Sequence, residues 1–216
     1  DKTAEIAKEF AKRNKRIKVF VRKKRKGLAS AILCGIKKSK NEIVCVLDAD
    51  LQHPPELIPK MFKKLEEKKA DIAIASRFIE GSKIEGLNFL RRFMSRIGSF
   101  VITILFPKIS HIHDPLSGFF ILKKEVIRGI RFKALGFKFL LEVLVKGNYR
   151  EVVEIPFTFH KRRAGKSKLT LKESKENLKL VFHLFKATKE YRRIGKFFLV
   201  GMSGIFVNEG LLWLLT

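Results

Sequence analysis

The stretch that decides the fold class is residues 43–53, which read IVCVLDADLQH. Its first five residues are apolar and predict a buried strand. The strand ends at Asp48 and Asp50, two carboxylates one residue apart, and Gln52 follows them. In open α/β sheets, ligands bind at the carboxyl ends of the strands. The stretch therefore predicts a ligand site at a sheet edge.

The residue types in this loop favour a metal ion. Two carboxylates and an amide oxygen are hard ligands that suit Mg²⁺ or Mn²⁺, and such an ion can neutralise a bound diphosphate. We therefore predict that Asp48, Asp50 and Gln52 surround a divalent cation. The alternative is a solvated turn that happens to contain two acids, because a bare Asp-x-Asp is a common pattern.

The rest of the chain alternates between helical and strand patterns. Helices are predicted at 3–13, 27–39, from 54 onward and at 136–146, and strands at 17–22, 43–47, 71–76, 119–122 and 151–157. This order predicts an α/β fold with a layered, mostly parallel sheet. The chain begins on a helix, so we expect the first strand of the usual parallel unit, which carries part of the ligand site, to be missing from this sequence.

The charge is extreme, with 47 Lys and Arg against 21 Asp and Glu and a net charge of +26 over 216 residues. Such a balance predicts a polyanionic partner: nucleic acid, an anionic membrane or a phosphorylated substrate. A lysine-rich surface of the thermophile kind is the alternative. The chain has 20 Phe but only 2 Tyr and no recognisable nucleic-acid-binding motif. We therefore expect no nucleic-acid partner.

Three segments have the composition of membrane contacts. Residues 88–106 combine apolar side chains with three Arg and predict a helix in a membrane interface, or alternatively a core helix. Residues 170–194 predict an amphipathic helix on the membrane surface. Residues 195–216 are mostly apolar after a basic flank, which predicts the start of a transmembrane segment with that flank on the cytoplasmic side. We expect a catalytic domain at 1–169, held at the cytoplasmic face of the cell membrane.

The positions of the cationic residues predict two phosphate-binding sites. Arg77 follows the strand at 71–76, at the same sheet edge as the acids, and Arg91 and Ser95 are one helical turn apart. These three predict a phosphate site separate from the metal. The basic segment 160–168 predicts a loop that folds over a diphosphate through Arg162 and Lys168. A solvated basic loop or a nuclear-localisation-like patch is the alternative.

Several of these segments together resemble one known protein family. Segments 27–31, 48–56, 76–78, 91–95, 114–120 and 162–169 occur in the order typical of one family, across about residues 15–170. The long string DADLQHPPE at 48–56 is the most specific of them. The chain resembles the dolichol-phosphate mannose synthase group of family 2 glycosyltransferases, which have a Rossmann-like GT-A fold. The tail from residue 195 resembles the opening of the membrane domain fused to some members.

The resemblance implies a role for each matching residue. It implies metal ligands at Asp48, Asp50 and Gln52, with Asp50, Arg77 and Arg91 as the catalytic residues. It implies acceptor-phosphate ligands at Arg77, Arg91 and Ser95. It implies donor-binding residues at Asp48, Asp50, Asp114, Arg162 and Lys168. Lys138 and Glu142 are spaced i, i+4, and we expect them to form a structural pair.

The implied reaction is an inverting transfer of mannose from GDP-mannose to a polyprenyl (dolichyl) monophosphate, with Mg²⁺ or Mn²⁺. The acceptor phosphate is already anionic at neutral pH, so no strong general base is needed. The barrier is mostly one of positioning and charge. UDP-glucose or another nucleotide sugar is the main alternative donor. A membrane-associated protein without activity is a further alternative, and a nucleic-acid-binding protein is the least favoured.

Overall fold

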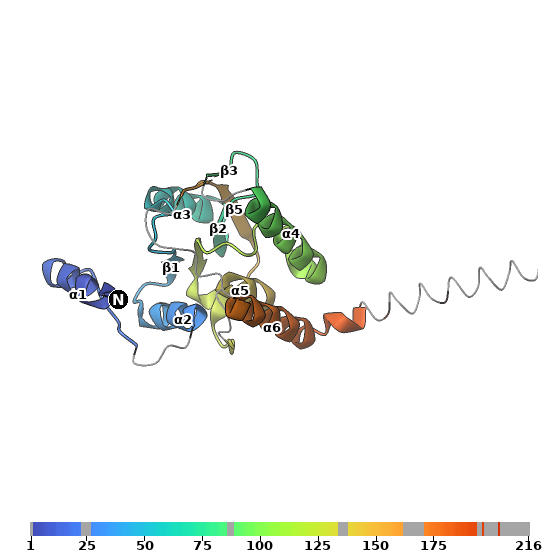
Figure 1. Cartoon of the computed structure of the whole chain (residues 1–216). Coiled ribbons are helices and arrows are strands. Elements are labelled where there is room, and N and C mark those ends of the chain that lie inside the picture. Colours follow the sequence, from blue (N-terminus) through green and yellow to red (C-terminus); the bar gives the residue numbers. More distant parts are fainter. Residues whose placement is uncertain are drawn as a thin grey trace, which may run out of the picture.

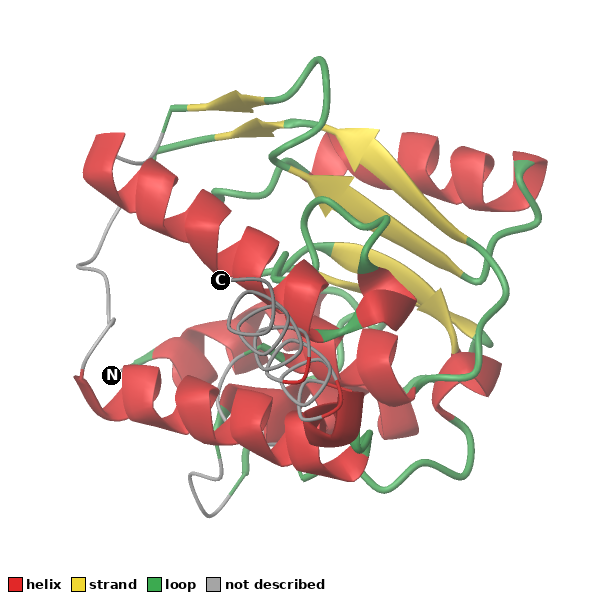
Figure 2. Cartoon of the chain, turned by 90° about the vertical axis from the view of Figure 1, so that its right-hand side faces the viewer, coloured by secondary structure: helices red, strands yellow, loops and turns green. Residues whose placement is uncertain are grey.

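The structure, a computed structural model, describes residues 2–22, 27–85, 89–133, 138–161, 171–193, 196 and 203. Its main sheet has four strands in the order β1-β4-β2-β5. These strands are β1 (Ile43–Val46), β2 (Ile72–Ser76), β4 (Phe120–Lys123) and β5 (Val152–Pro156). Figure 2 shows a second, smaller pair beside this sheet, formed by β3 (Lys83–Ile84) and β6 (Thr158–Phe159).

The sheet lies between two layers of helices (Figure 1). On one face, α3 (Ile58–Glu67) packs through Met61 and Leu65 against Ala73 and Ile121. The opposite face packs against α2 (Leu28–Lys38), α5 (Phe139–Lys146) and α6 (Leu171–Ala187), with α4 (Phe89–Leu105) beside them. Successive side chains of β2 alternate between the two faces, as the pleat of a strand requires. The sequence prediction of a layered α/β fold is therefore confirmed.

The prediction that the sheet is mostly parallel is wrong, because most strand pairs of the main sheet are antiparallel. Within the main sheet of the described residues, only β2 and β5 pair in parallel, whereas β4 lies between β1 and β2 and is antiparallel to both. An apolar run predicts that a strand is buried on both faces, but the run has the same composition whichever way the strand points. The carboxyl ends of β1, β2 and β5 still share one edge, which is where the site forms.

The strand expected at 17–22 does not form. All six residues are described, none of them is in a strand, and Ile17, Phe20 and Val21 remain 41%, 50% and 58% exposed. Apolar alternation produces a strand only where a neighbouring strand supplies hydrogen bonds, and no described strand pairs with this segment. The helix expected at 3–13 is confirmed as α1 (Thr3–Arg13), and it has no buried residue.

The segments with membrane-like composition have different outcomes. Helix α6 turns Leu180 and Leu184 into the core and leaves Leu178 and Phe182 exposed. In the part of the chain that the structure describes, no helix is both long enough and apolar enough to cross a membrane. The transmembrane segment expected at 195–216 lies outside the described residues, apart from Lys196 and Ser203. The boundaries 1–169, 170–194 and 195–216 stay predictions.

Candidate active site

The acidic loop, residues 47–54, connects β1 to α3 through the short helix at Pro55–Leu57. The backbone N–H of Asp48 donates to His53 Nδ1 at 3.2 Å, and Asp50 Oδ1 accepts from the Gln52 N–H at 3.2 Å. Leu51 adopts the left-handed region, with φ of 61°. These contacts turn the chain sharply and keep both carboxylates at the end of β1.

His53 is the inner support of this loop. Its ring is buried against Phe119, Phe157 and Phe159, with ring centroids 5.3 to 6.0 Å apart. Burial lowers the pKa of His53, although the charges of Asp48 and Asp50 oppose this shift. Because Nδ1 accepts the Asp48 N–H, the neutral ring carries its proton on Nε2. His53 therefore acts as a fixed packing and hydrogen-bonding group beneath the acids.

Gln52 joins the acidic loop to the end of β6. Its side-chain Nε2 donates to the backbone carbonyl of His160 at 3.0 Å, and its backbone carbonyl accepts from the backbone N–H of His160 at 3.2 Å. Since these residues are 108 positions apart, the fold alone brings the acidic loop to the start of the predicted basic segment.

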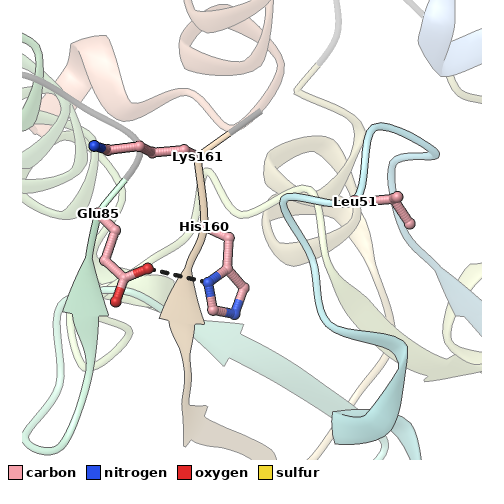
Figure 3. A pocket seen from close by; sticks show the side chains of 4 residues that line it. All are labelled: Leu51, Glu85, His160 and Lys161. Carbon is pink, nitrogen blue, oxygen red and sulfur yellow. Dashed lines mark hydrogen bonds and ion pairs between the residues drawn. The ribbon is translucent and has the colours of Figure 1, made fainter. Parts of the chain in front are cut away.

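A cavity of about 700 Å³ lies beside this junction and is lined by Leu51, Glu85, His160 and Lys161. Figure 3 shows Glu85 and His160 turned toward each other, with Leu51 of the acidic loop on the opposite side. His160 Nδ1 lies 3.1 Å from Glu85 Oε2, so the end of β6 is held from two directions. The site thus has an open hollow next to its acids.

Arg77 and Asp114 form a buried ion pair at the same edge. Arg77 Nε lies 2.7 Å from Asp114 Oδ2, Nη2 lies 2.8 Å from Oδ1, and the Arg77 backbone N–H donates to Oδ2 at 3.1 Å. The Asp114 side chain is 0% exposed and that of Arg77 is 11% exposed. Burial by itself lowers the pKa of Arg77, but the Asp114 charge and hydrogen bonds raise it above its ordinary value, so the guanidinium stays charged.

The loop around Asp114 is held by neighbouring strands. Glu154 on β5 accepts the N–H groups of His113 and Asp114 at 2.9 and 3.0 Å. Ser117 Oγ donates to the Ala75 carbonyl on β2 at 2.8 Å. At Gly118, a Cβ atom would lie 3.2 Å from Asp48 Oδ2, so this position allows the loop to approach the acid closely.

A family model described as Glycosyl transferase family 2 matches residues 1–131, which is more than half of the chain. The chain belongs to glycosyl transferase family 2. The predicted family is thereby confirmed. The acidic loop, Arg77 and Asp114 all lie within the matched residues.

Three relatives in this family carry the same name, dolichol-phosphate mannosyltransferase. The protein from Pyrococcus furiosus is 47% identical over 214 residues, covering 99% of this chain and 60% of the relative. The protein from Saccharomyces cerevisiae is 32% identical over 178 residues, covering 79% and 65%. The one from Mycosarcoma maydis is 31% identical over 174 residues, covering 79% and 58%. This family 2 chain therefore spans about 60% of the length of these relatives.

Solved structures of glucosyl-3-phosphoglycerate synthase from Mycobacterium tuberculosis share the fold. A complex with Mn²⁺, UDP and glucosyl-3-phosphoglycerate gives a TM-score of 0.53 at 17% identity, covering 78% of this chain and 56% of that one. A complex with phosphoglyceric acid gives 0.51 at 17% identity and the same coverage. At this identity the likeness concerns the fold alone, and it confirms an α/β fold of the GT-A kind.

The donor set of this family 2 chain fits a divalent ion. Asp48 is exposed, Asp50 is half-buried, and Gln52 lies on the same loop. Among the described residues, no group of three or more His, Cys, Asp and Glu side chains is arranged to hold a metal. Mg²⁺, however, usually binds one or two carboxylates and takes its other ligands from water and substrate phosphates. A two-carboxylate loop beside an open cavity matches that requirement.

The remaining predicted residues divide into two groups. Ser95 is half-buried on α4, and Arg91 lies one turn before it on the same helix. The side chain of Arg91 and all of Arg162 and Lys168 lie outside what the structure describes. Their predicted phosphate roles stay predictions.

The expected Lys138–Glu142 pair is wrong. Glu142 instead lies 2.6 Å from Lys146 Nζ and accepts the Lys133 N–H at 2.9 Å. Lys138 Nζ donates to the Leu116 carbonyl at 3.1 Å, in the Asp114 loop. Lys138 has non-helical dihedral angles as the N-cap of α5, so the i, i+4 rule does not apply to it.

Proposed function

We propose that this chain is the catalytic part of a dolichol-phosphate mannosyltransferase, which moves mannose from GDP-mannose to a polyprenyl (dolichyl) monophosphate. The observation that carries the proposal is the 47% identity to the Pyrococcus furiosus protein of that name across 99% of this chain. The geometry supports the reaction class, because two carboxylates lie beside a buried arginine–aspartate pair at one sheet edge.

In this proposal Asp48, Asp50 and Gln52 hold Mg²⁺ or Mn²⁺. A divalent ion held there would supply the positive charge that offsets the charge of the departing diphosphate. Arg162 and Lys168 bind the same diphosphate from the basic segment. Asp114 lies on the donor side in this proposal, and its ion pair also fixes Arg77. The Gln52–His160 contacts support a connection between the acidic loop and the basic segment.

Arg77, Arg91 and Ser95 bind the acceptor phosphate in this proposal. Asp114 takes two of the five guanidinium N–H donors of Arg77 and fixes its plane, and the acceptor phosphate would bind to the other donors. The acceptor oxygen is already anionic, so the residues act by holding two anions together rather than by removing a proton. Attack from the side opposite the leaving group inverts the anomeric carbon.

A donor panel tests the proposed function. Purified protein is given radiolabelled GDP-mannose, UDP-glucose or UDP-N-acetylglucosamine with a short polyprenyl phosphate and Mn²⁺. We expect label in the lipid fraction with GDP-mannose at least about tenfold above the other donors, and none after EDTA treatment. Preferred transfer from UDP-glucose would replace the sugar but keep the reaction class. Transfer that survives EDTA would refute the metal site.

We further propose that α4 brings the site to the cytoplasmic face of the cell membrane. Phe89, Phe93 and Phe100 are 84%, 53% and 64% exposed on this helix, and Arg92 and Arg96 are exposed among them. Its other side, with Ile102, is buried in the core. Exposed aromatic rings with adjacent cations match a bilayer that contains anionic lipids. The same helix carries Arg91 and Ser95, the proposed ligands of a lipid phosphate.

Replacing Phe89 and Phe93 together with serine tests this surface. Each Phe is worth about 1.5–3 kcal/mol when it is fully buried in an apolar phase, so we expect the double variant to bind anionic vesicles at least about tenfold more weakly. Co-sedimentation with phosphatidylglycerol-containing vesicles measures the change. Phe10→Ser on α1, where Phe10 is 58% exposed, is the matched control and should bind normally. Equal losses in both variants would contradict a membrane face on α4.

A further inference from the structure

Lys138 is a half-buried cation that the proposed mechanism leaves without a role. It begins α5 and reaches across to the loop at residues 114–118, where its Nζ donates to the Leu116 carbonyl at 3.1 Å. Asp114, two residues before Leu116, pairs with Arg77. Gly118, two residues after it, approaches Asp48. Lys138 therefore holds the middle of a loop whose two ends contact the functional groups of the site.

The charges around this amine connect it to the same groups. Burial and the Arg77 charge lower the pKa of Lys138 to about 8, while Asp114 and Asp48 raise it. The amine therefore lies within electrostatic range of one cation and both carboxylates. With Lys138 protonated, the four groups Asp48, Asp114, Arg77 and Lys138 sum to zero charge. Without it they carry a net negative charge, to which Asp50 of the same loop adds, at the edge where two phosphate groups must meet.

We propose that Lys138 is a positioning residue of this site. It fixes the 114–118 loop against the acidic loop, and its positive charge reduces the repulsion between this sheet edge and a bound phosphate. The inference rests on the proposed function, because it assumes that a metal–diphosphate group binds at the acidic loop. The competing view is that Lys138 only ties a loop to a helix and that its charge has no effect on ligands.

Lys124 offers a matched control. Its Nζ also donates to a backbone carbonyl, that of Ser39, at 2.7 Å, and it is also partly buried. Lys124 follows β4 at the opposite end of that strand from Gly118. A Lys124→Met variant therefore loses the same kind of contact without changing the charge near the acids.

The experiment measures binding of Mg²⁺ with inorganic diphosphate by calorimetry at pH 7, on the full chain. We expect Lys138→Met to bind at least about tenfold more weakly, Lys138→Arg to stay within about threefold of the unaltered protein, and Lys124→Met to bind normally. Normal binding by Lys138→Met, with only its Tm lowered, would overturn the proposal. An unaltered protein that does not bind the probe would instead overturn the proposed function.

A second measurement covers a Lys138→Met variant that does not fold. Between pH 7 and pH 9 the lysine amine loses most of its proton, because its pKa is about 8, whereas an arginine keeps its charge. Relative to Lys138→Arg, the unaltered protein should therefore lose affinity for Mg²⁺–diphosphate over this range. Identical pH profiles for the two proteins would overturn a role for the charge. The diphosphate changes its own charge equally in both, so the comparison removes that effect.

Discussion

Replacing Asp114 with alanine is expected to lower the free energy of unfolding by about 3–5 kcal/mol, because it leaves the Arg77 guanidinium charged and without its partner in the interior. The pair is buried and bidentate, with N–O distances of 2.7 and 2.8 Å. Asp114 also accepts the Arg77 backbone N–H, so that donor loses its acceptor too. Urea denaturation of both proteins measures the difference.

The double variant Arg77→Met/Asp114→Leu is the control for this stability effect. Removing both charges leaves no unpaired ion, and replacement of a buried pair by apolar residues is often neutral for stability. We therefore expect the double variant to regain most of the loss while remaining inactive. A single Asp114→Ala variant as stable as the unaltered protein would mean that Arg77 finds another partner.

Replacing Asp50 with alanine is expected to lower the proposed mannosyl transfer by at least about 10³-fold, because it removes a proposed ligand of the metal that would stabilise the leaving diphosphate. The structural cost should be small by comparison. Asp50 accepts the Gln52 N–H at 3.2 Å in a half-buried position, and such a bond contributes about 1 kcal/mol. Transfer assays with added Mn²⁺ and thermal denaturation separate the two effects.

Glu56→Ala is the matched control, since Glu56 is an exposed acid a few residues along the same loop and helix. It should keep both its activity and its Mn²⁺ affinity. Direct Mn²⁺ titration by electron paramagnetic resonance should show weaker binding for Asp50→Ala alone. Full transfer activity in Asp50→Ala would refute the assignment of the acidic loop as the metal site.

Much of the fold follows from local patterns. The apolar runs that became β1 and β2 end in polar residues, and a buried strand of this kind is recognisable without knowledge of its neighbours. The direction of β4 was not predictable in the same way. Its apolar residues satisfy the core whether it runs parallel or antiparallel, and the choice depends on β1 and β2 leaving one strand position between them. The segment 17–22 has a strand pattern but no described sheet partner.

The site shows the same division. Asp48, Asp50 and Gln52 lie within one short string, so a local motif was enough to bring them together as candidates. Contacts between residues far apart in the sequence could not be predicted from a local motif. Gln52 with His160, and Lys138 with Leu116, depend on loops from different strands meeting at one edge.

The amino-acid order by itself determined most of the helices and strands and where the acidic loop lies, because hydrophobic periodicity and a strand-ending pair of carboxylates act over a few residues. The tertiary structure alone decided that Arg77 is neutralised by Asp114 and that Lys138 donates to the Leu116 carbonyl instead of pairing with Glu142. The physical reason is burial. A charge removed from water must find an opposite charge or a hydrogen-bond acceptor, and only the packed chain determines which one is within reach.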